Sequence, residues 1–291
     1  MTTTAKTHAI PGIPRRRDLA IAAVALAVLL AAPALASPGA AAAADVERST
    51  SPAGAETWLL LVNGDDSELH HGNLRLAAES LARIGYRADR TIVLQPAGTA
   101  PAGLAAADGA TVLPATLDGW QAAIDHLRAQ TRGERPELLV YLTGHGKRKG
   151  GQSVLLLDRG VLAADRLADD LATLDLERLV VIADQCFSGG FADPFADWQG
   201  VDLTVVSSTD DSSTTSCPSF VHPFWRAATD PSKDLDRDGR VSVEEAVDAV
   251  RALIRRIPEG AVSAREWKEL SRPQILRTAD CGDCPTAFLS L

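Results

Sequence analysis

The chain has 291 residues, of which 46% are hydrophobic and 23% are charged, proportions typical of a globular protein rather than a disordered or fibrous one. Its formal net charge is −9 at pH 7. A surface of that sign repels phosphate groups, which excludes nucleic acid as an expected partner.

The first 36 residues have the order of features expected of a secretory signal peptide. Three arginines at 15–17 precede an apolar run over 19–32, and Ala34-Leu35-Ala36 before Ser37 completes a cleavage site with small residues at its first and third positions. The arginines also hint at a twin-arginine route, although Asp18 stands where such signals usually carry an apolar residue. We therefore expect a secreted or extracytoplasmic protein that has lost this segment.

An uncleaved membrane anchor is the alternative for this segment, because the apolar run approaches the roughly 18 residues that span a bilayer. Pro33 and the small-residue site favour cleavage, after which we expect no association with a membrane. Residues 37–56 are small, polar and proline-containing, and are expected to form a flexible linker. Residues 57–291 are long enough for one α/β domain.

The predicted strands are apolar on both faces, as in a parallel sheet that is covered on both sides. Such runs lie at 57–62, 137–143, 178–183 and 201–207, with a shorter candidate at 90–94. Stretches with helical spacing of apolar residues lie between them at 73–85, 117–131 and 163–174, and a hairpin is expected around 158–160. This alternation predicts a three-layer α/β/α sandwich with a mostly parallel central sheet.

Polar and reactive residues follow the strands, at the edge where the carboxyl ends of parallel strands meet and ligands bind. The strand-end segments are Asn63-Gly64-Asp65-Asp66, Gly144-His145-Gly146, Asp184-Gln185-Cys186 and Ser208-Thr209-Asp210-Asp211.

Cys186 and His145 are the candidate nucleophile and base. A thiol is only slightly ionised at neutral pH, so it needs an adjacent base, and an imidazole at a neighbouring strand end supplies one. The N–H groups of Gly146 and Cys186 would face the oxygen that becomes anionic during acyl transfer. The alternative is a small buried cysteine and a hydrogen-bonded loop histidine, each common by itself. Their occurrence together, with glycines beside both, favours catalysis.

The two segments together resemble the caspase, metacaspase and legumain clan of cysteine peptidases. "YLTGHGKRKGG" at 141–151 is followed by "DQCFSGG" at 184–190, with the cysteine 41 positions after the histidine. The resemblance extends over 57 to about 228 and includes "GNLRLAAESLARIGY" at 72–86, which is similar to the first helix of caspase-like domains. It implies a caspase-like sandwich and a cysteine endopeptidase that acts on a protein or peptide substrate.

The resemblance also implies a pocket for the residue before the scissile bond. Asp184 stands where metacaspases carry an acid and caspases a glutamine, which implies a preference for Arg or Lys; legumain-like members also carry an acid there and prefer Asn. The segment "SSTDDSSTTSC" resembles the wall of the legumain pocket and contributes Ser208, Asp210 and Asp211 as candidates. The alternatives are a solvated strand end for Asp184 and a plain Asx turn for the other two aspartates.

Residues before the first predicted helix could touch substrate or orient His145 as a third catalytic group, but no motif spacing identifies which residue does so. His70 and His71 are expected at the surface or in helix capping, and Asn63 and Asp65 in a turn. The group that orients His145 is therefore left open.

A calcium loop is predicted in "DLDRDGRVSVEE" at 234–245, which resembles an EF-hand loop. Its oxygen ligands would come from Asp234, Asp236, Asp238, the Arg240 carbonyl, Ser242 and Glu245, with Gly239 at the sharp turn. A helix is expected to follow, while Pro231 interrupts the entering side; acid-rich turns capping that helix are the alternative. No organic cofactor is expected, since "GHGKRKGG" lacks the third glycine of a dinucleotide-binding loop.

Three further cysteines follow Cys186, namely Cys217, Cys281 and Cys284. Cys281 and Cys284 are disulfide candidates as a local clip or a redox pair, and a zinc ribbon would need a second such pair. The expected function is thus an exported cysteine endopeptidase. A catalytically silent calcium-binding or interaction module on the same fold, and an Asn-specific peptidase or ligase, are the alternatives.

Overall fold

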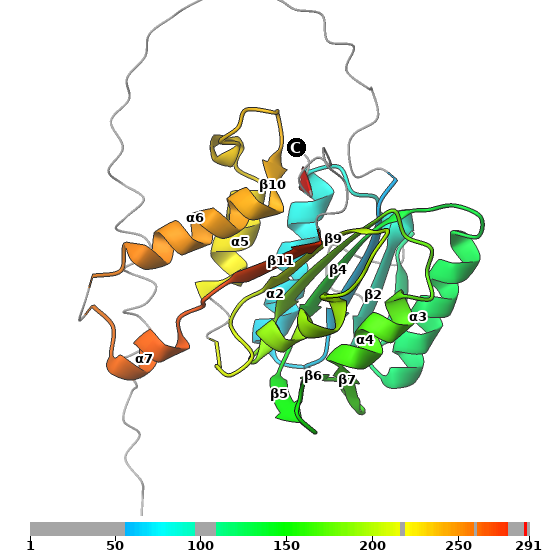
Figure 1. Ribbon diagram of the computed structural model, residues 1–291, viewed down its shortest axis with the longest axis horizontal. Coiled ribbons are helices and arrows are strands. Elements are labelled where there is room, and N and C mark those ends of the chain that lie inside the picture. Colours follow the sequence, from blue (N-terminus) through cyan, green and yellow to red (C-terminus); the bar gives the residue numbers. More distant parts are fainter. Residues whose placement is uncertain (1–55, 97–108, 216–218, 259–260, 279–287, 290–291) are drawn as a thin grey trace, which may run out of the picture. The chain divides into compact units, whose positions relative to one another are not determined.

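A seven-stranded sheet forms the centre of the computed structural model, which describes residues 56–96, 109–215, 219–258, 261–278 and 288–289 (Figure 1). All neighbouring strands are parallel except the first pair, which is antiparallel. In spatial order the strands are β11 (Gln274–Thr278), β9 (Asp202–Ser207), β8 (Arg178–Asp184), β4 (Glu137–Thr143), β1 (Trp58–Asn63), β2 (Thr91–Gln95) and β3 (Thr111–Pro114).

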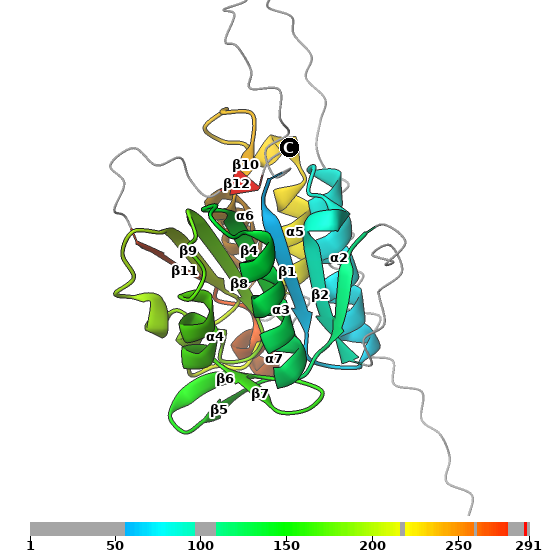
Figure 2. The same cartoon turned by 90° about the vertical axis from the view of Figure 1, so that its right-hand side faces the viewer.

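Helices cover both faces of this sheet (Figures 1 and 2). On one face Val140 and Val181 pack with Trp120 of α3 (Leu117–Gln130) and with α4 (Ala164–Leu171). On the other face Tyr141 and Ile182 pack with α2 (Glu68–Arg83), α5 (Val221–Ala228) and α6 (Val243–Arg255). Successive strand residues point to opposite faces, so both faces must be apolar for both helical layers to pack. The predicted three-layer sandwich is confirmed.

A small antiparallel sheet extends from the end of β4. It consists of β5 (Gly146–Lys149), β6 (Gln152–Leu156) and β7 (Val161–Ala163), and the expected hairpin around 158–160 joins the last two. The remaining described elements are β10 (Val241–Ser242), which pairs with β12 (Phe288–Leu289), and α7 (Ala264–Glu269). The hairpin sheet and the β10 strand lie at opposite ends of the central sheet in both views (Figures 1 and 2).

The helix predicted at 73–85 begins earlier, at Glu68, with Ser67 in an extended conformation before it. Polar residues in its first turn hide this start in the sequence, and the earlier start places His70 inside the helix. The signal peptide, nearly all of the linker, and Cys217, Cys281 and Cys284 lie outside the described residues. Within the described part of the chain, no helix has the length and apolar character needed to cross a membrane.

Candidate functional site

Cys186 and His145 come from adjacent parallel strands that end level with each other. Thr143 at the end of β4 pairs with Asp184 at the end of β8. His145 and Cys186 each lie two residues beyond this pair, on the same edge of the sheet. The strand pairing therefore brings together the two segments that the sequence nominated.

The contact between these segments is close enough to require a glycine. A Cβ atom added at Gly146 would lie 1.9 Å from the carbonyl oxygen of Cys186 and 2.9 Å from its carbonyl carbon. The start of β5 thus lies directly against the backbone of the turn that contains Cys186 and Phe187, which we call the cysteine turn. Phe187 has a left-handed φ of 61° in this turn. No other residue fits at 146 without moving one of the two segments.

The N–H group of Gly146 is directed away from the hairpin. Gly146 pairs with Leu155, and Leu156 N–H donates to the carbonyl oxygen of His145 at 2.8 Å. In an antiparallel ladder, a hydrogen bond between the residue before Gly146 and the residue after Leu155 means that Gly146 and Leu155 are a non-hydrogen-bonded pair. The N–H group of each residue in such a pair points away from the partner strand. This orientation suits the oxyanion role expected for Gly146.

Asp65 is a site residue that sequence reasoning treated as a turn former. Its Oδ2 lies 3.6 Å from Nε2 of His145. The carboxylate is held in place because Oδ1 accepts from Ser67 N–H at 2.9 Å, and Asp65 N–H donates to Oδ1 of Asn63 at 3.0 Å. Burial by itself raises the pKa of Asp65, but the hydrogen bonds from Ser67 and the nearby charges of His145 and His70 together lower it. Asp65 is therefore an anion that faces the candidate base.

His70 is also part of the site, so the expectation of a surface or capping role is wrong for this residue. Its side chain is buried, and its ring meets that of His145 edge to face, with 5.2 Å between centroids. Nδ1 lies 3.3 Å from Oγ1 of Thr143. Burial lowers the pKa of His70 against the opposing effect of Asp65, which favours the neutral form of the ring. His71 instead faces outward, 3.1 Å from Asp66.

The thiol of Cys186 is half-buried beneath the segment that follows β9. Thr215 N–H donates to Sγ at 3.5 Å, and Sγ lies 3.7 Å from the Thr215 carbonyl oxygen. Phe187 N–H donates to the Ser213 carbonyl oxygen at 2.8 Å, which fixes this segment alongside the cysteine turn. Cys186 is a free thiol among the described residues.

The carboxyl group of Asp184 is buried and not exposed to a substrate. Its side chain is fully buried, and its Oδ2 accepts from Thr143 Oγ1 at 3.3 Å, Tyr141 Oη at 3.4 Å and Asn73 Nδ2 at 3.5 Å. Burial raises the pKa of this carboxyl well above its ordinary value, although the hydroxyls of Thr143 and Tyr141 oppose the rise. The solvated strand end considered as an alternative is excluded. A pocket role remains a prediction that requires the carboxyl to be uncovered.

The other residues predicted for the pocket have structural partners. Ser208 is fully buried, with its Oγ 3.2 Å from that of Ser188. Asp210 forms the Asx turn considered as its alternative, since Oδ1 accepts from Ser212 N–H at 2.9 Å. Asp211 pairs with Arg148 of β5 at 2.7 Å, an ion pair that joins the hairpin sheet to the segment that follows β9. The polar contacts of these three residues therefore account for their positions near the cysteine turn.

The predicted calcium loop brings carboxylates together at the other end of the domain. Oxygen atoms of Asp234, Asp236 and Glu245 lie within 4.8 Å of one another. Gly239 has a φ of 91°, and its N–H donates to Oδ2 of Asp234 at 2.9 Å, which closes the sharp turn. Hard oxygen ligands in a glycine-closed loop fit Ca²⁺.

The other loop residues have distinct places. Asp238 Oδ1 accepts from Arg240 N–H at 2.8 Å, and Asp238 is not one of the three converging carboxylates. Ser242 is the N-cap of α6 in a capping box with Glu245, whose Oε1 also accepts from Leu235 N–H. The expected following helix is thus present as α6, and its capping box matches the alternative interpretation of these acids. Glu245 is therefore both a candidate calcium ligand and the residue that completes the capping box of α6.

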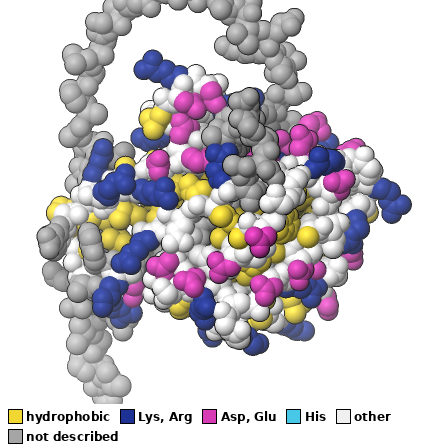
Figure 3. Space-filling view, viewed as in Figure 1, with side chains coloured by type: hydrophobic (Ala, Val, Ile, Leu, Met, Phe, Trp, Pro, Cys, Tyr) yellow, Lys and Arg dark blue, Asp and Glu magenta, His cyan; other side chains and the backbone are white. Residues whose placement is uncertain are grey.

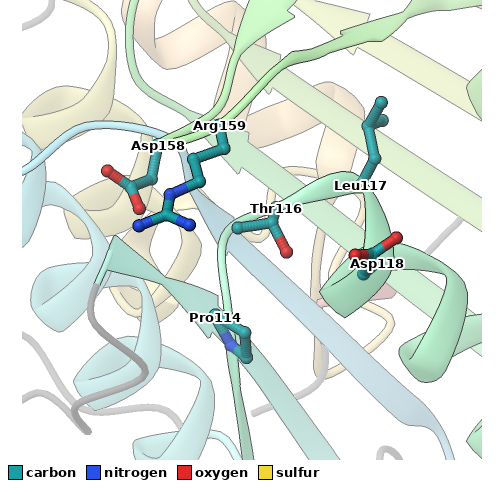
Figure 4. Close-up of a pocket in the computed structure, with 6 residues that line it drawn as sticks. All are labelled: Pro114, Thr116, Leu117, Asp118, Asp158 and Arg159. Carbon is teal, nitrogen blue, oxygen red and sulfur yellow. The ribbon is translucent and has the colours of Figure 1, made fainter.

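A cavity of about 520 Å³ lies between the β3–α3 connection and the β6–β7 turn (Figure 4). It is lined by Pro114, Thr116, Leu117, Asp118, Asp158 and Arg159. This lining contains no thiol and no histidine. The candidate catalytic site is therefore the strand-end cluster, which consists of Asp65, His70, His145 and Cys186. On the face shown in Figure 3, Lys and Arg side chains lie among Asp and Glu side chains, without a continuous basic area in its described part.

Comparison with known proteins assigns no relative: no protein-family model matches this chain, and no curated protein matches it. The geometry of the strand-end cluster is therefore the basis for a functional assignment.

Proposed function

We propose that this chain is an exported cysteine endopeptidase in which Cys186 is the nucleophile and His145 the base. The observation that carries the proposal is the contact of Gly146 with the Cys186 carbonyl, because it joins the histidine and cysteine segments at the ends of two paired strands. A carboxylate beside the histidine and an outward N–H at Gly146 add the other parts that acyl transfer needs.

The reaction proceeds in two steps. Asp65 lies beside Nε2 of His145, which leaves Nδ1 to take the thiol proton as Sγ bonds to the substrate carbonyl carbon. The peptide C–N bond then breaks, and His145 returns that proton to the leaving amine. Water attacks the thioester in the second step, His145 takes its proton, and the thiol is restored as the carboxylic acid product leaves. The Gly146 and Cys186 N–H groups stabilise the oxyanion in both steps.

Substrate choice is proposed from the motif alone. The resemblance of Asp184 to the metacaspase acid favours Arg or Lys before the scissile bond, and Asn is the second candidate. The buried position of Asp184 requires a rearrangement to admit a basic side chain. We propose a protein or peptide substrate, with no nucleic-acid partner, and a calcium ion in the 234–245 loop that stabilises the domain.

The test is hydrolysis of fluorogenic peptide libraries in the presence of calcium. Wild type should cleave after Arg or Lys, while Cys186→Ala and His145→Ala should lose about 10³-fold or more of kcat/KM. His126→Ala is the matched control, because that histidine lies on α3 against Trp58, and its activity should be unchanged. If wild type and Cys186→Ala are equally inert across the library, the chain is a silent binding module.

A ligase is separated from a peptidase by adding a peptide with a free amino terminus. An acyl-enzyme can be intercepted by an amine in place of water, and mass spectrometry distinguishes the ligated product from the hydrolysed one. We expect hydrolysis to dominate because the histidine side chain is 64% exposed and water reaches it freely.

A further inference from the structure

We propose that Asp65, His70 and His145 form a binding site for a divalent transition-metal ion of the zinc class, and that occupation of this site switches Cys186 chemistry off. The binding part is independent of the peptidase proposal, and the switching part rests on it.

The positions of the ligand atoms carry the proposal. One nitrogen of each histidine and one oxygen of Asp65 all lie within 4.8 Å of one another. Nε2 of His145 and Oδ2 of Asp65 are 3.6 Å apart. Two ligands of a tetrahedral zinc ion, each about 2.0–2.1 Å from the metal, are separated by roughly 3.4 Å. The cluster thus needs a contraction on the order of 1 Å to become a three-ligand site with an open fourth position.

The surrounding hydrogen bonds prepare these groups as ligands. The Thr143 hydroxyl donates its proton to Asp184, so it accepts from Nδ1–H of His70. That tautomer leaves the lone pair on Nε2 of a neutral ring, and a polar group on the second ring nitrogen is the usual support of a metal-bound histidine. Asp65 is fixed by Ser67 and Asn63, so little conformational entropy is lost when a metal binds.

The ligand set also selects the ion. Two imidazoles and one carboxylate suit zinc, copper or nickel, whereas calcium and magnesium require mainly oxygen ligands. The oxygen-rich loop around Asp234 has the opposite preference, so the two ends of the domain should bind different metals.

The consequence for His145 follows from its two nitrogens. A metal ion on Nε2 requires a neutral imidazole, which then carries its proton on Nδ1. Nδ1 is the atom that would take the thiol proton, so a metal-bound His145 no longer acts as a base. Zinc should therefore inhibit reversibly, and a chelator should restore activity.

The test is calorimetric titration of the whole protein with zinc chloride, with calcium at saturation. We expect His70→Ala to weaken zinc binding at this site at least tenfold, while the matched control His71→Ala, which faces outward beside Asp66, leaves it unchanged. Asp65→Asn is the second variant, since it keeps the turn and the fold while removing the charge; it should weaken binding similarly. Cobalt substitution separates this site from thiolate sites elsewhere, because its spectrum lacks a sulfur charge-transfer band.

Zinc affinity that is unchanged in both His70→Ala and Asp65→Asn overturns the site. Loss of zinc binding in these variants, with no peptide cleavage by metal-free wild type, keeps the site and removes the peptidase proposal. Peptide cleavage that zinc does not inhibit in wild type at saturating occupancy overturns the switch.

Discussion

His145 meets two side chains from the segment after β1, Asp65 and His70, and neither belongs to the motif that identified it. In the proposed mechanism, the carboxylate near Nε2 fixes the ring tautomer and stabilises the imidazolium that forms when the thiol loses its proton. We therefore propose Asp65 as the positioning residue that the sequence left unassigned.

We expect Asp65→Asn to lower kcat about 10²-fold with a small effect on KM, because the substitution removes the charge but retains the oxygen that accepts from Ser67. Steady-state kinetics on a cleaved peptide measure this. Asp66→Asn is the matched control, since Asp66 is largely exposed and pairs with His71. Equal losses in both variants would contradict a positioning role for Asp65.

Asp184 gives a prediction about stability. Burial raises the pKa of Asp184 in the folded state. Between the ordinary pKa of an aspartate and this raised value, the native protein therefore binds more protons than the unfolded chain. The favourable contribution of the protonated form is complete below the unfolded pKa and is lost as pH rises through the raised folded pKa.

Asp184→Asn should therefore stabilise the protein at pH 8 more than at pH 5, because the amide keeps an acceptor for Tyr141 and Thr143 without a buried charge. Urea unfolding midpoints of wild type and variant at the two pH values measure this difference. A variant that is less stable than wild type at pH 8 would contradict this prediction. It would show that the ionised carboxylate is stabilised in the folded state by its hydrogen bonds.

At the scale of elements, the site depends on the contact between β5 and the cysteine turn. Gly146→Ala places a methyl group against the Cys186 carbonyl, so one segment must shift by an ångström or more. A displacement of about 1 Å in a reacting group costs on the order of 10²-fold in rate. We expect that loss in kcat/KM, with the fold retained by circular dichroism.

Gly72→Ala is the matched substitution for this experiment. Gly72 lies in α2, and nothing approaches the position of its added Cβ within 4 Å. Alanine there should stabilise the helix by about 0.5–1 kcal/mol and leave activity unchanged. Wild-type activity in Gly146→Ala would contradict the proposed contact.

The elements differ in how well the sequence predicts them. β1, β4, β8 and β9 were predictable because both of their faces are buried and their residues are accordingly apolar. β5 has the sequence GKRK and no apolar residue; it is a strand because β6 pairs with it. β11 has the sequence QILRT, which is short and has only two apolar residues, and it pairs antiparallel with β9. Local propensity is a weak guide to strands of these two kinds.

At the scale of the whole molecule, topology pairs the ends of β4 and β8, which lead into His145 and Cys186. The predicted calcium loop, which includes β10, lies at the other end of the sheet (Figures 1 and 2). The strand-end rule predicted the first of these from sequence. It could not identify Asp65 and His70, because the sequence of a strand-end loop does not say which side chain turns toward a neighbouring loop. The resemblance, and not the strand-end rule, made Asp184 a candidate for the substrate pocket, and nothing in the sequence indicated that its side chain is fully buried.

Calcium should raise the melting temperature of the whole domain through its loop. At a calcium concentration 100-fold above Kd, binding adds about 2.7 kcal/mol of stability, and each kcal/mol corresponds to roughly 2–4 °C for a domain of this size. Asp236→Asn should abolish the shift measured by calorimetry, and Asp248→Asn, on α6 beside Arg251, should retain it. An unchanged melting temperature between calcium and EGTA would leave the acids as helix caps only.

The central claim is that His145 activates the thiol of Cys186, and the rate at which iodoacetamide alkylates Cys186 tests it most directly. Peptide mapping isolates this cysteine from the other three, and the measurement needs no knowledge of the substrate. At pH 6.5 in metal-free buffer, wild type should react at least about tenfold faster at Cys186 than His145→Ala, with His126→Ala equal to wild type. Equal alkylation rates in wild type and His145→Ala would contradict the claim.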